Sequence, residues 1–510
     1  MRHGARALLG AWSVPLAAAV ALRVLSLLHP HLIDTDGAYY GAVARWFAAG
    51  HWAKALDPVW PPLYPLLVSG FVRLGIPVEA AGIGVSMVAS LVCVCTSAGL
   101  ARAIGGERAG VAAAWLAAVH PKLVVFSLQL LTEMTYVAFA SAALWILAAR
   151  ARRRMVQAAC GGASLGAAFL VRPEALALLV PTLGWLFWVD RRQALRRRAR
   201  RVAACAVGFA CLALPYIGWV SHLEGRFTPG EKGALNFYLT YRDRYVADGI
   251  PVRPADFAAI TAPETRREPG DYNIGAFLRR HPGMVLRHAA ANVPRALFDK
   301  LPGLVGWPLF ALAVAGVVVR RRDARLRPSL LWAAWIVTIA AAIAPIFLYR
   351  RFFVAAIPPC IAWGALAVDA AWTRWPRRPV TLGFAALLVG LVIANQVTLG
   401  RAQPPLLYRD AGLALRARAG PGAIVAARKP ETSFYAAAQF RPLEGQDWAT
   451  LRAGLERDQV THVVAEDYIL PRSHPGLVGL LQPEQVPGWL TLLYETRDAR
   501  HRVLVYAFTP

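Results

Sequence analysis

Two adjoining stretches near the start of the chain decide its fold: the apolar run LLGAWSVPLAAAVALRVLSLL (residues 8–28) and the polar segment HPHLIDTDGAYY (residues 29–40). The first can cross a membrane, because about 20 mostly apolar residues span the hydrocarbon core. A cleaved signal peptide is the alternative, but no polar mature start follows Ala17–Ala19, so we expect a retained helix. The second stretch places Asp34 and Asp36 at the membrane rim, where carboxylates are costly unless they bind or react with something.

The composition extends this pattern to most of the 510 residues. The chain is 57% hydrophobic and 17% charged, whereas soluble domains are about half apolar and a quarter charged. The six cysteines lie in apolar stretches, without the spacing of a disulfide framework or a zinc site. We therefore expect an all-α polytopic membrane protein with about eleven spanning helices, at residues 8–28, 79–103, 109–127, 132–149, 156–172, 173–190, 202–222, 303–319, 328–348, 351–371 and 379–400.

The net charge of +26 sits mainly in short loops between these runs, at Arg150–Arg154, Arg191–Arg201, Arg320–Arg327 and Arg374–Arg378. Basic loops of this kind stay on the cytoplasmic side, so the charge sets topology and does not indicate nucleic-acid binding. With the N-terminus inside, eleven spans put every cluster in the cytoplasm. The outer face then receives residues 29–78, the short turn at 128–132, residues 223–302 and everything after residue 401.

Two further segments complete the predicted organisation. Pro61–Gly75 is apolar but short and begins with prolines, so we expect a helix that lies in or dips into the outer leaflet. After Gln403, short strands near residues 422–427 and 460–465, a helix at 448–458 and a hairpin at 490–508 predict a small α/β domain. The predicted domains are a membrane domain, residues 1–401, and an extracytoplasmic domain, residues 402–510.

Candidate site residues gather on the predicted outer face. Glu133 opens a helix there and joins Asp34 and Asp36 as a candidate catalytic acid, although Asp34 could instead cap a helix and Glu133 could pair with its helix dipole. Lys122 and the adjacent Arg350 and Arg351 are candidate phosphate ligands, and snorkelling anchors are the alternative. Arg172–Pro173–Glu174 is expected to form a salt-linked turn between two helices.

With these residues in place, the chain resembles GT-C membrane glycosyltransferases that use polyprenyl-phosphate sugars, and within them the family 39-like enzymes, which include protein O-mannosyltransferases and the aminoarabinose transferase of lipid A. The resemblance rests on an ordered set of motifs: Asp36 four residues before Tyr40, followed by Ala44–Arg45; Pro61–Pro62–Leu63–Tyr64–Pro65; His120–Pro121; Thr132–Glu133; and Arg350–Arg351–Phe352–Phe353 with Pro358–Pro359. The chain departs from the family in having Asp36–Gly37 in place of Asp-Glu, and Trp60 where a lysine often precedes the paired prolines.

The resemblance implies an inverting transferase in the inner membrane of a bacterium, with its site and C-terminal domain periplasmic. Asp36 would be the general base, assisted by Asp34 and Glu133, and Arg350, Arg351 and Lys122 would hold the donor phosphate. The expected partners are a polyprenyl-phosphate sugar, membrane lipids and an acceptor that is a glycan, a lipid or a protein. A divalent metal near the acids, with His51 as a further ligand, stays open, because two or three acids without a ligand histidine do not demand one.

Two other classes of protein remain as alternatives. A transporter or flippase of a lipid-linked substrate would be expected to show repeated halves and broken midplane helices with buried ionisable groups. No half of this chain repeats the other, and its acids lie at the rim. A lipid-binding scaffold without activity would not need the paired outer acids.

Overall fold

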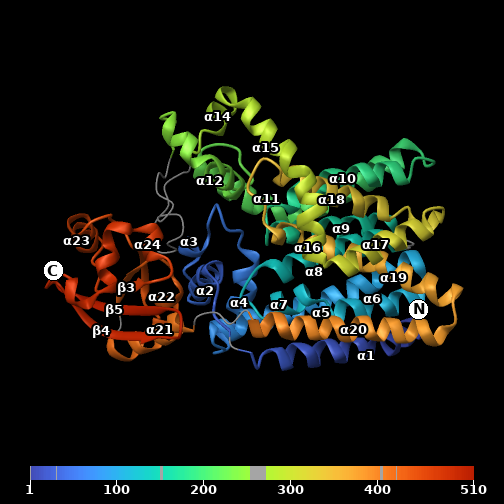
Figure 1. Ribbon diagram of the computed structural model, residues 1–510. Helices are drawn as coiled ribbons and strands as arrows, with labels where there is room; N and C mark the ends of the chain where they lie inside the picture. Colours follow the sequence, from blue (N-terminus) through green and yellow to red (C-terminus); the bar gives the residue numbers. More distant parts are fainter. Residues whose placement is uncertain (1, 30, 150–152, 253–270, 402–405, 421) are drawn as a thin grey trace.

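The computed structural model describes residues 2–510 except residue 30 and residues 150–152, 253–270, 402–405 and 421. Most of the chain forms a helical bundle, and a sheet-containing domain caps one end of it (Figure 1). Four predicted regions fall partly outside the described residues: the Arg150–Arg154 cluster, the outer segments 29–78 and 223–302, and the C-terminal domain at its start, 402–405.

The first half of the bundle contains α1 (Arg2–Ser26), α2 (Thr35–Ala48), α3 (Trp52–Ala55), α4 (Leu63–Arg73), α5 (Val78–Gly105), α6 (Glu107–Val119), α7 (Pro121–Ser127), α8 (Glu133–Ala148), α9 (Arg154–Phe169), α10 (Ala175–Val189) and α11 (Leu195–Glu224). The second half contains α12 (Lys232–Ala247), α14 (Ile274–Arg280), α15 (Pro282–Arg295), η1 (Ala296–Lys300), α16 (Leu301–Val305), α17 (Trp307–Arg320), η2 (Ala324–Leu326), α18 (Ser329–Ile343), η3 (Arg350–Ala356), α19 (Ile357–Arg374) and α20 (Arg377–Arg401). α20 lies beside α1 (Figure 1), where Gln396 Nε2 donates to Ser26 Oγ at 3.4 Å.

Every run predicted to span the membrane contains a helix, and the short segment at 61–75 contains α4. Among the described residues, four helices are long and apolar enough to cross a membrane, or six if each sharply bent pair forms one crossing. The chain is a multi-pass membrane protein. The eleven crossings and their orientation stay predictions, because several of the apolar helices are shorter than a full crossing.

Two of the predicted runs are bent, which the apolar pattern alone does not predict. α6 and α7 meet at 52° across His120, whose extended backbone precedes Pro121. The helical segment Pro282–Val305 meets α17 at 110° across Gly306, which has a φ of +89° that other residues rarely adopt. The second bend turns the chain from the α15 region back into the bundle.

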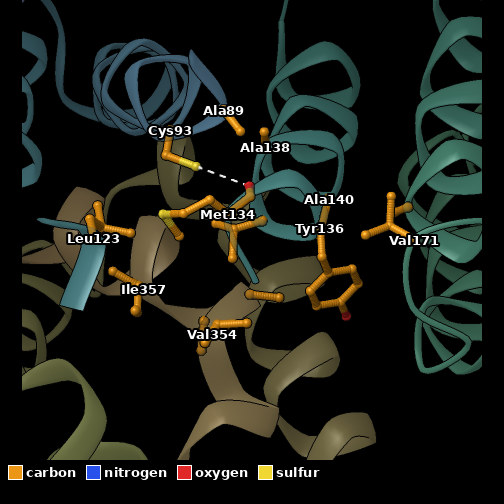
Figure 2. Packing of buried hydrophobic residues seen from close by; sticks show 14 of the residues in the cluster. Ala89, Cys93, Leu123, Met134, Tyr136, Ala138, Ala140, Val171, Val354 and Ile357 are labelled. Carbon is orange, nitrogen blue, oxygen red and sulfur yellow. Dashed lines mark hydrogen bonds between the residues drawn. The ribbon is translucent and has the colours of Figure 1, made fainter. Parts of the chain in front are cut away.

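The core of the bundle fixes the start of α8 against its neighbours. Cys93 of α5 lies 3.9 Å from the carbonyl oxygen of Met134, and both side chains are fully buried (Figure 2). Val354 of η3 and Ile357 of α19 close the same cluster (Figure 2). Dense packing of this kind resists displacement of any one element. Glu133, one residue before Met134, is therefore held in a fixed place beside η3.

The C-terminal domain is a five-stranded mixed sheet of order β2-β1-β3-β5-β4 covered by helices. β1 pairs in parallel with β2 and β3, and β5 pairs antiparallel with β3 and β4. Its elements are α21 (Leu407–Arg418), β1 (Ile424–Ala427), α22 (Glu431–Ala436), β2 (Gln439–Pro442), α23 (Trp448–Arg457), β3 (His462–Glu466), α24 (Leu470–Ser473), η4 (Pro475–Leu481), η5 (Pro483–Gln485), β4 (Leu490–Arg497) and β5 (Arg502–Phe508). The predicted strands, helix and hairpin are confirmed, whereas β2 and α22 were not expected from the sequence.

Candidate active site

The two acids of the first outer segment have different places at the start of α2. Asp34 is the N-cap, and its carboxylate accepts a hydrogen bond from the backbone N–H of Asp36 at 3.0 Å. This is the capping role that the sequence left open for Asp34. Asp36 stands in the first helical turn, and no part of its carboxylate is used by the cap. Asp36 is therefore the acid whose side chain is available to a site.

Arg351 brings Asp36 and Glu133 together. Its Nη1 lies 3.0 Å from Asp36 Oδ2 and 3.9 Å from Glu133 Oε1. The Asp36 side chain is 25% exposed, whereas that of Glu133 is 2% exposed. Three predicted site residues from α2, α8 and η3 thus meet at one place, with Asp36 reachable from solvent and Glu133 behind it.

Arg172, between α9 and α10, lies on the inner side of Glu133. One guanidinium nitrogen is 3.0 Å from Glu133 Oε1 and the other is 3.0 Å from Glu174 Oε1. The predicted salt-linked turn of Arg172 and Glu174 is confirmed, and it also reaches the site. A buried arginine that holds two carboxylates fixes their positions, because leaving either charge unpaired in a buried place is costly.

Lys232 is a site residue that sequence reasoning missed. It opens α12 in the long segment after α11, and its Nζ lies 4.1 Å from the centroid of the Trp60 ring. Its charge interacts favourably with Glu174 and with Asp36. Burial lowers the pKa of Lys232 to about 8, and Glu174 opposes that fall. No sequence signal marks a lysine in a polar loop as a neighbour of a segment some 170 residues away.

Arg350 and Lys122 form a separate cationic group. The Arg350 guanidinium packs over Gly303, where an added Cβ would lie 2.9 Å from it, and its Nη2 is 3.9 Å from Asp299 Oδ1. Lys122 interacts electrostatically with Arg350. The adjacent arginines therefore diverge, since Arg351 faces the acids and Arg350 faces α16 and Lys122. The three predicted phosphate ligands are not gathered around one point in this structure.

The C-terminal domain contacts the segment that carries Asp34 and Asp36. Thr35 Oγ1 donates to Glu431 Oε1 of α22 at 2.8 Å, and the backbone N–H of Ile33 donates to the Tyr435 hydroxyl at 3.0 Å. Phe434 packs directly on Gly41, where an added Cβ would come within 2.6 Å of its ring. α22 thus holds both sides of the segment that carries Asp34 and Asp36. Any side chain larger than hydrogen at position 41 would displace α22.

The acids of this region do not form a metal-ligand set. Within the described part of the chain, no group of three or more His, Cys, Asp or Glu side chains could hold a metal ion. The guanidinium of Arg351 occupies the space between Asp36 and Glu133, and Arg172 holds the inner face of Glu133. Charge at this site is balanced by arginine and lysine side chains. His51 lies at the N-terminus of α3, outside this constellation.

Comparison with solved structures matches nearly the whole chain. ArnT from Cupriavidus metallidurans, solved bound to undecaprenyl phosphate, aligns with a TM-score of 0.60 at 16% identity over 98% of both chains. The chain has the GT-C fold. The archaeal oligosaccharyltransferase AglB from Archaeoglobus fulgidus, solved with an inhibitory peptide and a dolichol-phosphate, aligns with a TM-score of 0.59 at 13% identity, over 98% of this chain and 74% of AglB.

A sequence comparison supports the same group of proteins. The family model described as dolichyl-phosphate-mannose-protein mannosyltransferase matches residues 59–219, which is about a third of the chain. That region includes Glu133, Arg172 and Glu174, but neither Asp36, Lys232 nor Arg351. No curated protein sequence matches the chain significantly. The resemblance to GT-C membrane glycosyltransferases predicted from the sequence is confirmed.

Proposed function

We propose that this protein transfers a hexosyl or pentosyl group from a polyprenyl-phosphate donor to a glycan, lipid or protein acceptor at the outer face of the membrane. The observation that carries the proposal is the constellation of Asp36, Arg351 and Glu133 within the GT-C fold. In this constellation the carboxylate of Asp36, which solvent can reach, pairs with the guanidinium of Arg351 at the end of a helical bundle. A soluble-substrate enzyme would not need this site beside apolar helices.

Asp36 is the proposed general base. The acceptor hydroxyl gives its proton to the Asp36 carboxylate, while its oxygen forms a bond to the anomeric carbon of the donor. The bond from that carbon to the phosphate oxygen breaks at the same time, and its electron pair leaves on the polyprenyl phosphate. No acid is needed for the leaving group, because a phosphate ester is already a good one. A single displacement of this kind inverts the anomeric configuration.

Arg351 is the proposed phosphate ligand closest to the base. A guanidinium binds phosphate through two parallel donors, and Arg351 is 36% exposed, so it can exchange Asp36 for a phosphate oxygen. When it does, the Asp36 carboxylate loses its ion-pair partner and is free to accept a hydrogen bond from the acceptor hydroxyl. Donor binding would thus switch on the base.

Lys232 is a second proposed phosphate ligand, and it stands over Trp60, where the resembling family often carries a lysine. A flexible lysine acts as a point charge for phosphate, in contrast to the planar fork of arginine. Arg350 and Lys122 form a more distant cationic pair that would meet the phosphate as it approaches from the lipid side. Asp34 and Glu133 act by positioning, the first as the cap of α2 and the second through Arg351.

The relatives support the class of donor without identifying the sugar. ArnT was solved with undecaprenyl phosphate and AglB with a dolichol-phosphate. We infer a bacterial inner membrane location, with the site and a C-terminal domain at residues 402–510 in the periplasm. The hydrogen bonds that Ile33 and Thr35 donate to α22 support a role for that domain. It would hold in place the segment of the 1–401 membrane domain that carries Asp34 and Asp36.

Purified protein offered polyprenyl-phosphate sugars tests the proposal. We expect release of polyprenyl phosphate that depends on an acceptor and is lost in Asp36→Asn. Proteoliposomes loaded with the same donor distinguish the transporter alternative, because a transporter or flippase would move the donor across the bilayer without breaking it. Translocation of intact donor with no released polyprenyl phosphate would contradict a transferase.

A further inference from the structure

At the end of the bundle that lies away from the C-terminal domain (Figure 1), a cavity opens among the ends of α8, α9, α10 and α11. The end of α8, the start of α9, the loop from α10 to α11 and the residues just before α18 surround this cavity of about 530 Å³. Its walls include Arg154, Arg191, Arg192, Arg201 and Arg327. A neighbouring cavity of about 440 Å³ shares Arg154 and Arg201 with the first. The helix ends here are opposite to those that carry Asp36 and Glu133.

Positive charge in this double cavity is far from balanced. The second cavity adds Arg197 and Arg200, so seven arginines face the two spaces. Asp190 is the one acid among the described lining residues, and it already pairs with Arg154 at 3.0 Å and with Arg201 at 2.6 Å. Converging like charges with low-dielectric walls repel one another and focus a positive field into the cavity. An anion bound there would relieve that repulsion.

The topological rule for basic loops does not explain the position of Arg201. Its side chain is 8% exposed, and its Nε has no hydrogen-bond partner among the described residues although it is fully buried. A charge needed only to keep a loop in the cytoplasm would stay in open water. A buried guanidinium with a donor left over is costly unless something accepts from it.

Apolar side chains flank the cavities and indicate an amphipathic occupant. Met155, Phe187, Trp188 and Leu195 are all 40% or more exposed, and Met155 and Trp188 line the cavities themselves. Exposed tryptophan beside arginine is typical of the level at which lipid headgroups meet acyl chains. The Arg198 and Arg191 guanidinium groups lie 3.7 Å and 4.7 Å from the Phe187 and Trp188 ring centroids, and both aromatic side chains still remain 40% exposed. A lone inorganic ion would leave that remaining apolar surface uncovered.

We propose that this double cavity binds the phosphate headgroup of an anionic phospholipid, with the acyl chains lying along the rim formed by Phe187, Trp188 and Leu195. Basic pockets between membrane helices on the cytoplasmic side bind anionic headgroups in this way. The site is separate from the proposed transferase site, and the proposal does not depend on it. A structural lipid here would hold the start of α9 and the α10–α11 loop together.

Native mass spectrometry of the delipidated full-length protein tests the site. Wild type and Arg191→Gln/Arg192→Gln are titrated with phosphatidylglycerol and with phosphatidylcholine. Because each arginine near the surface contributes about 1 kcal/mol to anionic lipid binding, the double variant should bind phosphatidylglycerol on the order of 10- to 30-fold more weakly. Arg377→Gln/Arg378→Gln is the matched control, since it removes the same charge from exposed residues that line neither cavity.

The proposal requires wild type and the control pair to prefer phosphatidylglycerol over phosphatidylcholine by a similar factor. Equal binding of the two lipids by wild type, or an equal loss in both double variants, would overturn it. Glycerol 3-phosphate and inorganic phosphate serve as soluble probes of the same chemistry. If either displaces phosphatidylglycerol at millimolar concentration or below, the site takes a free phosphate and the assignment to a lipid is wrong. Monodisperse elution of every protein checks that the variants fold.

Discussion

Asp36→Asn is the substitution that separates chemistry from structure most cleanly. Asparagine keeps the shape of the side chain and removes its basicity. Loss of a positioned general base lowers the rate by 10² to 10⁴, which is about 3 to 5 kcal/mol of barrier. The structural cost is small, because the ion pair with Arg351 is partly exposed and contributes at most about 1 kcal/mol. The cap survives, because the backbone N–H of residue 36 donates to the Asp34 carboxylate whichever side chain residue 36 carries.

The assay compares the steady-state transfer rate and the thermal unfolding midpoint of purified variants. Asp36→Asn should lose turnover while its midpoint stays within about 2 °C of that of wild type. Glu133→Gln should differ, because it breaks a buried pair with Arg172 and costs about 3 to 5 kcal/mol of stability. Asp34→Asn retains an N-cap residue and should stay within about tenfold of wild type. An active Asp36→Asn beside an inactive Asp34→Asn would refute the choice of base.

Four further outcomes follow from the contacts. Arg351→Gln should lower kcat and raise the donor KM, so that kcat/KM falls at least tenfold, which is about 1.4 kcal/mol. Arg350 has a side chain that is 55% exposed, so Arg350→Gln should change both constants less. Equal effects of the two substitutions would contradict the separate roles of the two arginines. Wild-type donor KM should rise as the pH passes about 8 and Lys232 loses its proton, and a titration of Lys232→Arg that still shows this rise would exclude Lys232 as its cause. Thr35→Val should lower kcat while Thr35→Ser, which keeps the bond to α22, should restore it. Burial raises the pKa of Glu466 from 4.5 to about 7, so the folded state holds that proton more tightly than the unfolded state. The free energy of unfolding should therefore fall by about 3 kcal/mol as the pH rises from 4.5 through 7. Thermal melts of Glu466→Gln should not show that loss.

The parts of the fold that the sequence predicts are those set by local pattern. Long apolar runs locate the helices, and alternating or continuous apolar segments locate β1, β3 and the β4–β5 hairpin. β2 was not predicted, since its four residues, Gln439–Pro442, lack an apolar run and are specified by pairing with β1. The bend at Gly306 requires a positive φ. Glycine can adopt a positive φ but also adopts negative ones, so the sequence alone does not predict the bend.

The residues of the candidate site also fall into those that local sequence pattern predicts and those that it does not. Asp36, Glu133 and Arg351 stand at the ends of apolar runs, so a shared membrane face predicts that they meet. Lys232 reaches the site only through the folding of a long polar segment against Trp60, a contact between distant residues that no local pattern encodes. The adjacency of Arg350 and Arg351 predicts one shared role, but adjacent residues in η3 point in different directions. Sequence neighbours are therefore a weaker guide to a site than helix ends on one face.

The anomeric carbon of the transferred sugar offers the most direct test of the proposed reaction. Donor labelled with ¹³C at that carbon is mixed with the purified protein and acceptor, and its NMR signal is followed. A base at Asp36 acting in a single displacement predicts that the coupling to phosphorus disappears as a glycoside of opposite anomeric configuration forms, and that neither change occurs with Asp36→Asn. A product of retained configuration, or a donor signal that persists unchanged with wild-type protein and competent acceptor, would contradict the mechanism.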